Sequence, residues 1–309
     1  MSFTSTVKNE TSKLDLLLAE KTSELSAIMN NVGVFNLEGN QIKIATENAS
    51  VARRVFTLIK DLYGLSAKIT VRNGYNFNKN FHYILEIRSK TNYIFKDLSL
   101  DTLDKIPNTY IYADEDLVRA YLRGLFMAIG SINDPKTSRY HLEFLVNNKR
   151  YAQFIVTLLN SFQLKSKYIK REAKYMIYIK EAEKISDFLR IIKATQALLY
   201  FEDIRIYRDH KNSTNRLNNC EQANVDKLIK TANDQVKNIE IIMNSGGFEL
   251  LNDKVKEACV YRLKYQDASI FELSEIISVE TGKKITKSGL HHRFKKLKDL
   301  AEKIEKNSK

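Results

Sequence analysis

Hydrophobic and polar positions over the first two hundred residues follow helical and strand periodicities, in an order that occurs twice. The first copy is expected to contain, in order, a helix over 21–31, a β-hairpin around residues 38–40, a helix over 48–63 and strands over 66–72 and 82–87. The second copy is expected to contain a helix over 116–129, a strand over 140–146, a helix over 151–162, strands over 166–170 and 175–180 and a helix over 182–192. The order α-β-β-α-β-β-α, found twice, predicts an α+β fold with pseudo-twofold symmetry.

One helix in each copy carries small residues at positions suited to close packing. The second copy has Gly124 and Ala128 within 122–130, four positions apart and therefore on one helix face. In the first copy, 25–33 aligns with this stretch and places Ala27 at the position of Gly124. Two such helices lying side by side would form a seam between the copies. The alternative is a pair of ordinary amphipathic helices that each end at a glycine.

This paired pattern resembles the signature helices of the LAGLIDADG homing endonucleases. On that alignment the family's catalytic carboxylate falls on Ile129 in the second copy and on Val32 in the first. Cleavage would need acidic side chains there to hold a divalent metal. The resemblance therefore implies a nuclease scaffold without the reaction, and no enzymatic activity, metal or cofactor is expected. An active endonuclease is the rival hypothesis, with Asp134 a few residues beyond the second helix as its nearby carboxylate.

The C-terminal part has the pattern of a helix-turn-helix domain. Residues 201–247 are polar and helix-prone, which predicts a helical linker that ends at Ser245-Gly246-Gly247. Helices are then expected over 253–263 and 269–278, the second opening on a Ser269/Glu272 capping box. A turn over 282–285 leads to a third helix, whose apolar face is Leu290, Phe294 and Leu297. Helix, glycine-bearing turn and helix place the motif at about 268–301.

Charge supports DNA as the partner of this domain. The chain has 50 Lys+Arg against 37 Asp+Glu, a net charge of +13, and seven cations lie between Lys283 and Lys298 with no carboxylate among them. That local excess favours a recognition helix in the major groove of double-stranded DNA, although a three-helix bundle with a basic surface helix would show the same charges. The predicted DNA contacts are Lys283, Lys284, Thr286, Lys287, Ser288, Gly289, His291, His292, Arg293, Lys295 and Lys296.

A second group of cations lies on or between the strands of the second copy. Lys165, Lys167, Lys170 and Arg171 are candidates for a secondary DNA contact, and a solvated strand face is the alternative. Only two cysteines are present, and no apolar run approaches the ~20 residues that span a bilayer. These features predict a cytoplasmic, nucleoid-associated protein without a membrane partner.

Three segments together resemble the WhiA family, DNA-binding regulators widespread in Gram-positive bacteria. They are Leu122–Pro135, Asn215–Asn224 and Lys287–Leu297, in this order. The resemblance implies a degenerate LAGLIDADG domain joined to a helix-turn-helix similar to sigma-factor region 4. It also implies a role in cell division, chromosome segregation or, in spore formers, sporulation. Ile129 departs from the family, which usually has a small residue there.

The resulting domain prediction has two LAGLIDADG-like repeats, 1–110 and 111–200, a helical linker, 201–247, and a helix-turn-helix domain, 248–309. The predicted function is a non-enzymatic, sequence-specific DNA-binding protein that regulates transcription. A structural adaptor that binds a protein partner through its N-terminal domain is the other alternative. The DNA target, the oligomeric state and any effector do not follow from the sequence.

Overall fold

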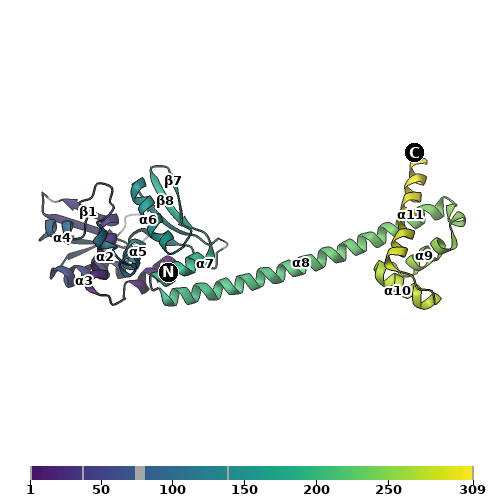
Figure 1. Ribbon diagram of the computed structural model, residues 1–309, viewed down its shortest axis with the longest axis horizontal. Helices are drawn as coiled ribbons and strands as arrows, with labels where there is room; N and C mark the ends of the chain where they lie inside the picture. The colour runs from purple at the N-terminus through teal and green to yellow at the C-terminus, as the bar shows by residue number, and fades with distance from the viewer. Residues whose placement is uncertain (1, 37, 74–80, 138, 308–309) are drawn as a thin grey trace. The chain divides into compact units, whose positions relative to one another are not determined.

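The computed structural model describes residues 2–36, 38–73, 81–137 and 139–307 (Figure 1). The chain divides into two compact units, Met1–Asp209 and His210–Lys309. The first unit contains both β-sheets, and in the described part of the second unit all regular structure is helical. The predicted α+β class and the repeated architecture are therefore confirmed.

The N-terminal unit repeats one arrangement of helices and strands. The first repeat contains α2 (Leu18–Val32), β1 (Gly33–Asn36), β2 (Gln41–Thr46), α3 (Ala49–Tyr63), β3 (Lys68–Asn73), β4 (Phe81–Ile87) and α4 (Thr91–Asp97). The second contains α5 (Glu115–Ile129), β5 (Gly130–Ile132), β6 (Leu142–Val146), α6 (Lys149–Ser161), β7 (Lys167–Arg171), β8 (Lys174–Ile179) and α7 (Ala182–Ile191). Each repeat forms a four-stranded antiparallel sheet, with strand order β1-β2-β4-β3 or β5-β6-β8-β7. Since the two orders correspond strand by strand, the pseudo-twofold relation extends to the sheet topology.

Helices α2 and α5 pack side by side along the predicted seam (Figure 1). A Cβ on Gly124 would overlap with the backbone carbonyl oxygen of Glu24, so only glycine allows this approach of the two backbones. Ala27, at the corresponding place on α2, is fully buried. The seam also exchanges side chains, because Ala27 packs into the core of the second repeat and Met127 of α5 packs into the core of the first.

The glycines that follow these helices are needed for space and not for a left-handed cap. Gly33 has φ −75° and Gly130 has φ −70°, both in the extended region. A Cβ on Gly33 would lie 2.6 Å from the Phe35 ring, and one on Gly130 would overlap with Phe126. Each helix therefore turns directly into the first strand of its sheet, which the capping-glycine alternative did not predict.

A buried ionic cluster crosses the seam. The fully buried Glu24 carboxylate accepts hydrogen bonds from Arg54 Nε of α3 and from Arg123 Nε of α5, both at 2.6 Å. Arg123 is itself fully buried, and its Nη2 lies 3.9 Å from a Glu20 carboxylate oxygen. If α2, α3 and α5 moved apart, these pairs would break and leave buried charges without a partner. The cluster therefore holds the three helices in their relative positions.

An additional helix, α1 (Phe3–Thr11), precedes the repeats and was not predicted. It packs against α5 and β5 of the second repeat and against α3 of the first. Thr4 Oγ1 donates to the Ile132 carbonyl at 2.8 Å and accepts from the Ile132 amide at 2.9 Å. Only three of its nine residues are buried, Phe3, Val7 and Thr11, so its apolar stripe is short.

The expected helical linker over 201–247 is part of one long helix, whose end belongs to the core of the C-terminal unit. Helix α8 runs without interruption over Thr195–Asn244, followed by a 3-10 turn, Gly247–Leu250, and by α9 (Asp253–Lys264), α10 (Ile270–Thr281) and α11 (Lys287–Asn307). Ile239 and Ile242 of α8 are fully buried in one core with residues of α9, α10 and α11. The last turns of the expected linker are therefore part of this core. No helix in the described ranges is long and apolar enough to cross a membrane.

Candidate nucleic-acid interface

Helices α9, α10 and α11 of the C-terminal unit pack around one core, and α10 and α11 are the two helices of the helix-turn-helix motif. Leu290, Phe294, Leu297 and Ala301 of α11 are buried against Leu273 and Ile277 of α10 and against Ala258 and Cys259 of α9. The α11 residues recur at spacings of three and four, so they occupy a single face of the helix. The remaining faces of its first half are free to carry polar side chains.

A buried arginine organises the connection between α9 and α10. Arg262 Nη1 donates to the carbonyl oxygens of Tyr265, Gln266 and Ala268 at 3.2, 3.2 and 2.6 Å. Its guanidinium also lies 5.5 Å from the Phe294 ring centroid. Burial lowers the pKa of Arg262 from its ordinary value, and these carbonyl dipoles offset part of the desolvation. The arginine thus joins the loop before α10 to α11.

The turn between α10 and α11 is fixed by a glycine and a serine. Gly282 has φ +69°, a left-handed conformation that closes α10 and that a residue with a Cβ adopts only with strain. Ser278 Oγ accepts from the Ile285 amide at 2.9 Å, which holds the end of the turn against α10. The predicted turn over 282–285 therefore has a left-handed glycine at its start and a hydrogen bond to α10 at its end.

Both helices of the motif begin with side-chain caps. Ser269 Oγ accepts from the Glu272 amide at 3.2 Å, and Glu272 accepts from the Ser269 amide at 2.7 Å, the expected capping box. The backbone hydrogen bond from Ser269 lowers the pKa of the Glu272 carboxyl. Thr286 caps α11, since its Oγ1 accepts from the Gly289 amide at 3.2 Å. Thr286 thus has a structural role at the start of α11.

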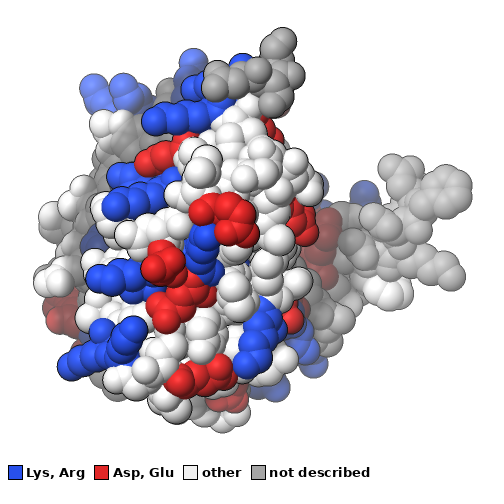
Figure 2. Space-filling view, turned by 90° about the vertical axis from the view of Figure 1, so that its right-hand side faces the viewer, with Lys and Arg blue, Asp and Glu red and all other residues white. Residues whose placement is uncertain are grey.

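The side chains predicted to contact DNA are exposed, with one exception. Exposed are Lys283, Lys284, Thr286, Lys287, Ser288, Gly289, His291, His292, Lys295 and Lys296. Figure 2 views the molecule from the right-hand side of Figure 1 and shows Lys and Arg side chains at the left edge and at the lower right, with Asp and Glu side chains between them. The turn and the first half of α11 present cations and polar side chains to solvent.

The exposed residues of α11 divide into an outward face and two flanks. At 100° per residue, Ser288, His292, Lys295 and Lys296 all lie on the side of the helix away from the buried Leu290 and Phe294. On one flank, Lys287 and His291 line a cavity of about 550 Å³ together with residues of α8 and the start of α10. On the other flank, Arg293 lines a cavity of about 330 Å³ shared with α9, and His292 and Lys296 of the outward face border the same cavity.

Arg293 is the exception among the predicted contacts. Its Nη1 donates to the Lys254 carbonyl at 2.9 Å and lies 3.2 Å from a Glu257 carboxylate oxygen. The side chain is only 18% exposed. The structure therefore directs Arg293 towards α9, where it helps to hold α11 against α9, and the periodicity of the sequence did not distinguish this role.

The secondary group of cations does not form one surface. Strand alternation places Lys167 and Arg171 of β7 on the same face of their sheet and Lys170 on the other face. Lys165 precedes the strand and pairs with Glu181 at 3.1 Å. Two of the four predicted cations, Lys167 and Arg171, thus share one face of the sheet.

The ends of the seam helices carry the residues expected from the sequence. Val32 and Ile129 are the last residues of α2 and α5, and both pack partly against the cores of their repeats. Asp134 caps a turn, since its carboxylate accepts from the Lys136 amide at 2.9 Å. Among the residues that the structure describes, no cluster of three or more His, Cys, Asp or Glu side chains could hold a metal ion.

Comparison with known proteins agrees with this architecture over nearly the whole chain. Three family models match: the WhiA N-terminal LAGLIDADG-like domain at 19–101, the WhiA LAGLIDADG-like domain at 118–211 and the WhiA C-terminal HTH domain at 214–301. The "Probable cell division protein WhiA" of Staphylococcus aureus strain USA300 is 42% identical, over 98% of each chain, and the protein of that name from strain JH9 matches equally well. The crystal structure of full-length DUF199/WhiA from Thermatoga maritima is similar in fold, with a TM-score of 0.60, 22% identity and coverage of 98% of this chain and 99% of that one. The HTH model begins at residue 214, within α8.

Proposed function

The chain belongs to the WhiA family, and from this we propose that it is a non-enzymatic, sequence-specific DNA-binding protein that regulates transcription. The observation that carries the proposal is the outward face of α11, where Ser288, His292 and Lys295 stand exposed opposite a buried apolar face. A helix in this position within a helix-turn-helix enters the major groove with its N-terminal residues at the base edges.

The exposed side chains suggest a division between base and phosphate contacts. Ser288 and His292 lie in the first two turns of α11 and have hydrogen-bonding groups that fit base edges. Lys283 and Lys284 in the turn, and Lys287 at the start of the helix, are placed for phosphates on either side of the groove. These lysines would add affinity with little sequence information.

The biological role in this proposal follows from relatives. The Staphylococcus aureus proteins are named probable cell division proteins. Those names support the cell-division part of the proposal; we further propose that the chain acts in chromosome segregation, on the nucleoid in the cytoplasm. The N-terminal unit serves as a scaffold in this proposal, because hydrophobic residues occupy the ends of both seam helices, Val32 and Ile129.

The test combines mapping of bound sites with two substitutions on α11. Chromatin mapping supplies a target sequence, and anisotropy titrations then compare that duplex with a scrambled one. His292→Ala is expected to cost about 1–3 kcal/mol on the target and to reduce its preference over the scrambled duplex. Lys295→Ala is expected to weaken both complexes alike and to lower the salt slope by about one. If His292→Ala leaves the preference unchanged, α11 does not read the sequence as proposed.

Two further measurements test the rest of the proposal. If the paired substitution Lys167→Ala/Arg171→Ala leaves the salt slope unchanged, the sheet of the second repeat is not a DNA surface. Magnesium-dependent nicking of plasmid DNA that Asp134→Ala abolishes would overturn the non-enzymatic assignment.

A further inference from the structure

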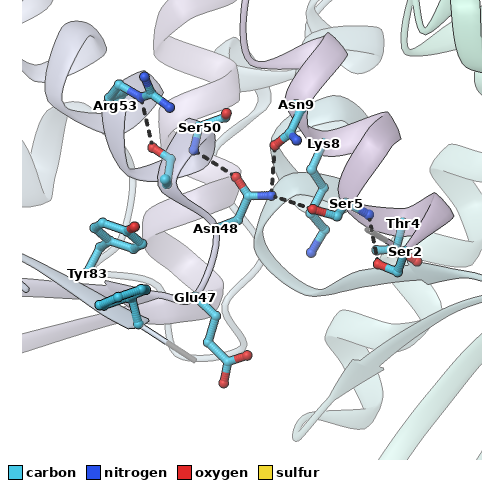
Figure 3. Close-up of a pocket in the computed structure, with 12 residues that line it drawn as sticks. Ser2, Thr4, Ser5, Lys8, Asn9, Glu47, Asn48, Ser50, Arg53 and Tyr83 are labelled. Carbon is cyan, nitrogen blue, oxygen red and sulfur yellow. Dashed lines mark hydrogen bonds between the residues drawn. The ribbon is translucent and has the colours of Figure 1, made fainter. Parts of the chain in front are cut away.

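The N-terminal unit contains a cavity of about 570 Å³ where α1, the start of α3 and the start of β4 meet (Figure 3). We propose that this cavity binds a mononucleotide, with the phosphate held by Lys8 and the helix starts and the base held against Tyr83 and Phe81. The volume lies within the roughly 300–1,000 Å³ typical of small-molecule sites. This site would give the N-terminal unit a ligand of its own, independent of DNA recognition by α11.

The amine of Lys8 is the first feature that favours an anionic ligand. Lys8 lines the cavity, is half-buried and lies 5.8 Å from the Phe126 ring centroid. Burial lowers the pKa of this amine to about 8, against the opposing effect of Glu47. Within the described ranges, no oxygen accepts a hydrogen bond from the Lys8 amine. A phosphate oxygen would supply that acceptor and favour the charged form of the amine.

Two helix starts border the same cavity. Ser2 Oγ caps α1 by accepting from the Ser5 amide at 3.2 Å, and Asn48 Oδ1 caps α3 by accepting from the Ser50 amide at 2.8 Å. The Asn48 amide group donates to Ser5 Oγ at 3.3 Å and to Asn9 Oδ1 at 3.0 Å, which joins the two helix starts (Figure 3). The positive ends of both helix dipoles therefore lie at a cavity that the Lys8 side chain also lines.

The opposite wall offers a second cation and two aromatic rings. Figure 3 shows Arg53 and Tyr83 on the other side of Asn48 from Lys8. Arg53 is exposed, and its Nε donates to the Ala49 carbonyl at 3.3 Å; among the described residues no acceptor engages its terminal N–H groups, which can therefore bind a ligand. Phe81 is 50% exposed beside Tyr83, so an aromatic face is open for a base.

The lining charges favour a phosphate over a cationic ligand. Glu47 is the one carboxylate among the described lining residues, against Lys8 and Arg53. Its Oε1 lies 4.0 Å from His82 Nδ1. A ligand with a phosphate at one end and a flat ring at the other matches both walls of the cavity.

Calorimetric titration of the full-length chain tests the proposal with three ligands: adenosine 5′-monophosphate, ribose 5-phosphate and inorganic phosphate. Adenosine 5′-monophosphate is expected to bind about tenfold more tightly than ribose 5-phosphate, because only the nucleotide stacks on the aromatic wall. Lys8→Gln is expected to weaken nucleotide binding by about tenfold or more, since a charge-assisted hydrogen bond is lost. The control Lys60→Gln changes the same charge at an exposed position in the last turn of α3 and should bind as the parent does.

A second readout reports on the amine itself. After reductive methylation with ¹³C, the NMR signal that is absent in Lys8→Gln should titrate near pH 8 and move to higher pH when adenosine 5′-monophosphate saturates the site. Arg53→Gln, at an exposed position, gives a second variant if Lys8→Gln lowers stability.

Several outcomes would overturn the proposal. They are no saturable binding at millimolar ligand, equal losses in Lys8→Gln and Lys60→Gln, and equal affinity for adenosine 5′-monophosphate and ribose 5-phosphate. If a short DNA duplex competes with the nucleotide and reverses the shift of the Lys8 NMR signal, the cavity binds DNA phosphate instead.

Discussion

Glu24→Gln should destabilise the N-terminal unit more than any surface substitution, because Glu24 is the shared partner of two arginines. The carboxylate is fully buried, and both Arg54 Nε and Arg123 Nε lie 2.6 Å from it. Removing its charge leaves two buried guanidinium groups without their main counter-ion, which costs about 3–5 kcal/mol. At about 2–4 °C per kcal/mol for a unit of this size, the thermal midpoint should fall by roughly 10 °C.

Differential scanning calorimetry and urea denaturation of the full-length chain measure this loss. The matched control is Glu115→Gln on α5, which removes an exposed i,i+4 partner of Arg119 and should cost about 0.5 kcal/mol or less. A variant with methionine at Glu24, Arg54 and Arg123 together should recover much of the loss, because no buried charge remains. The reasoning fails if Glu24→Gln costs no more than the control, or if the triple variant is several kcal/mol less stable than Glu24→Gln.

Three further predictions concern single positions. Gly282→Ala should lower the stability of the C-terminal unit by about 1 kcal/mol or more in urea denaturation, since φ is +69° there, and an unchanged midpoint would contradict the assigned turn. Arg293→Ala should lower the thermal midpoint of the C-terminal unit, because its contacts with α9 are lost. Lys295→Ala should leave that midpoint unchanged and weaken DNA binding, because Lys295 is exposed. A lower midpoint in Lys295→Ala with an unchanged one in Arg293→Ala would refute the two roles. The pKa of Lys8 is about 8 in the folded chain and ordinarily 10.5, so the unfolded state binds more protons between these values. Unfolding free energy should therefore rise with pH across that window relative to Lys8→Met, and parallel profiles would exclude the shift.

The elements of the helix-turn-helix were predictable because their signals are local. The Ser269/Glu272 capping box, Gly282 and the apolar spacing of Leu290 and Phe294 each specify a boundary or a face within one or two turns of helix. The corresponding hydrogen bonds and burial occur where these signals predict them. Local chemistry of this kind does not depend on what the rest of the chain packs against.

The features that were missed depend on contacts distant in sequence. Glu24 and Arg123 read as polar positions of amphipathic helices, yet both are fully buried because they meet across the seam. In the sequence, Arg293 is one of the basic residues of the predicted third helix. Its pairing with Glu257 could not be predicted, because Glu257 lies 36 residues earlier on another helix. Helix α1 has a stripe of three buried residues, too short to distinguish from a polar tail before its partners are known.

The position of α8 decides which experiment can assign DNA binding to the C-terminal unit. A truncation at Gly247 would separate Ile239 and Ile242 from the core that they share with α10 and α11, because these residues lie on the N-terminal side of the cut. Binding lost after that truncation would report a disrupted core as readily as a missing interface. Substitutions at His292 and Lys295 avoid this ambiguity, since both side chains are exposed and lie opposite the buried face of α11. Six of the seven cations between Lys283 and Lys298 are exposed, all except Arg293, so point substitutions at these six lysines lower the local positive charge without disturbing the packing of Arg293 on α9.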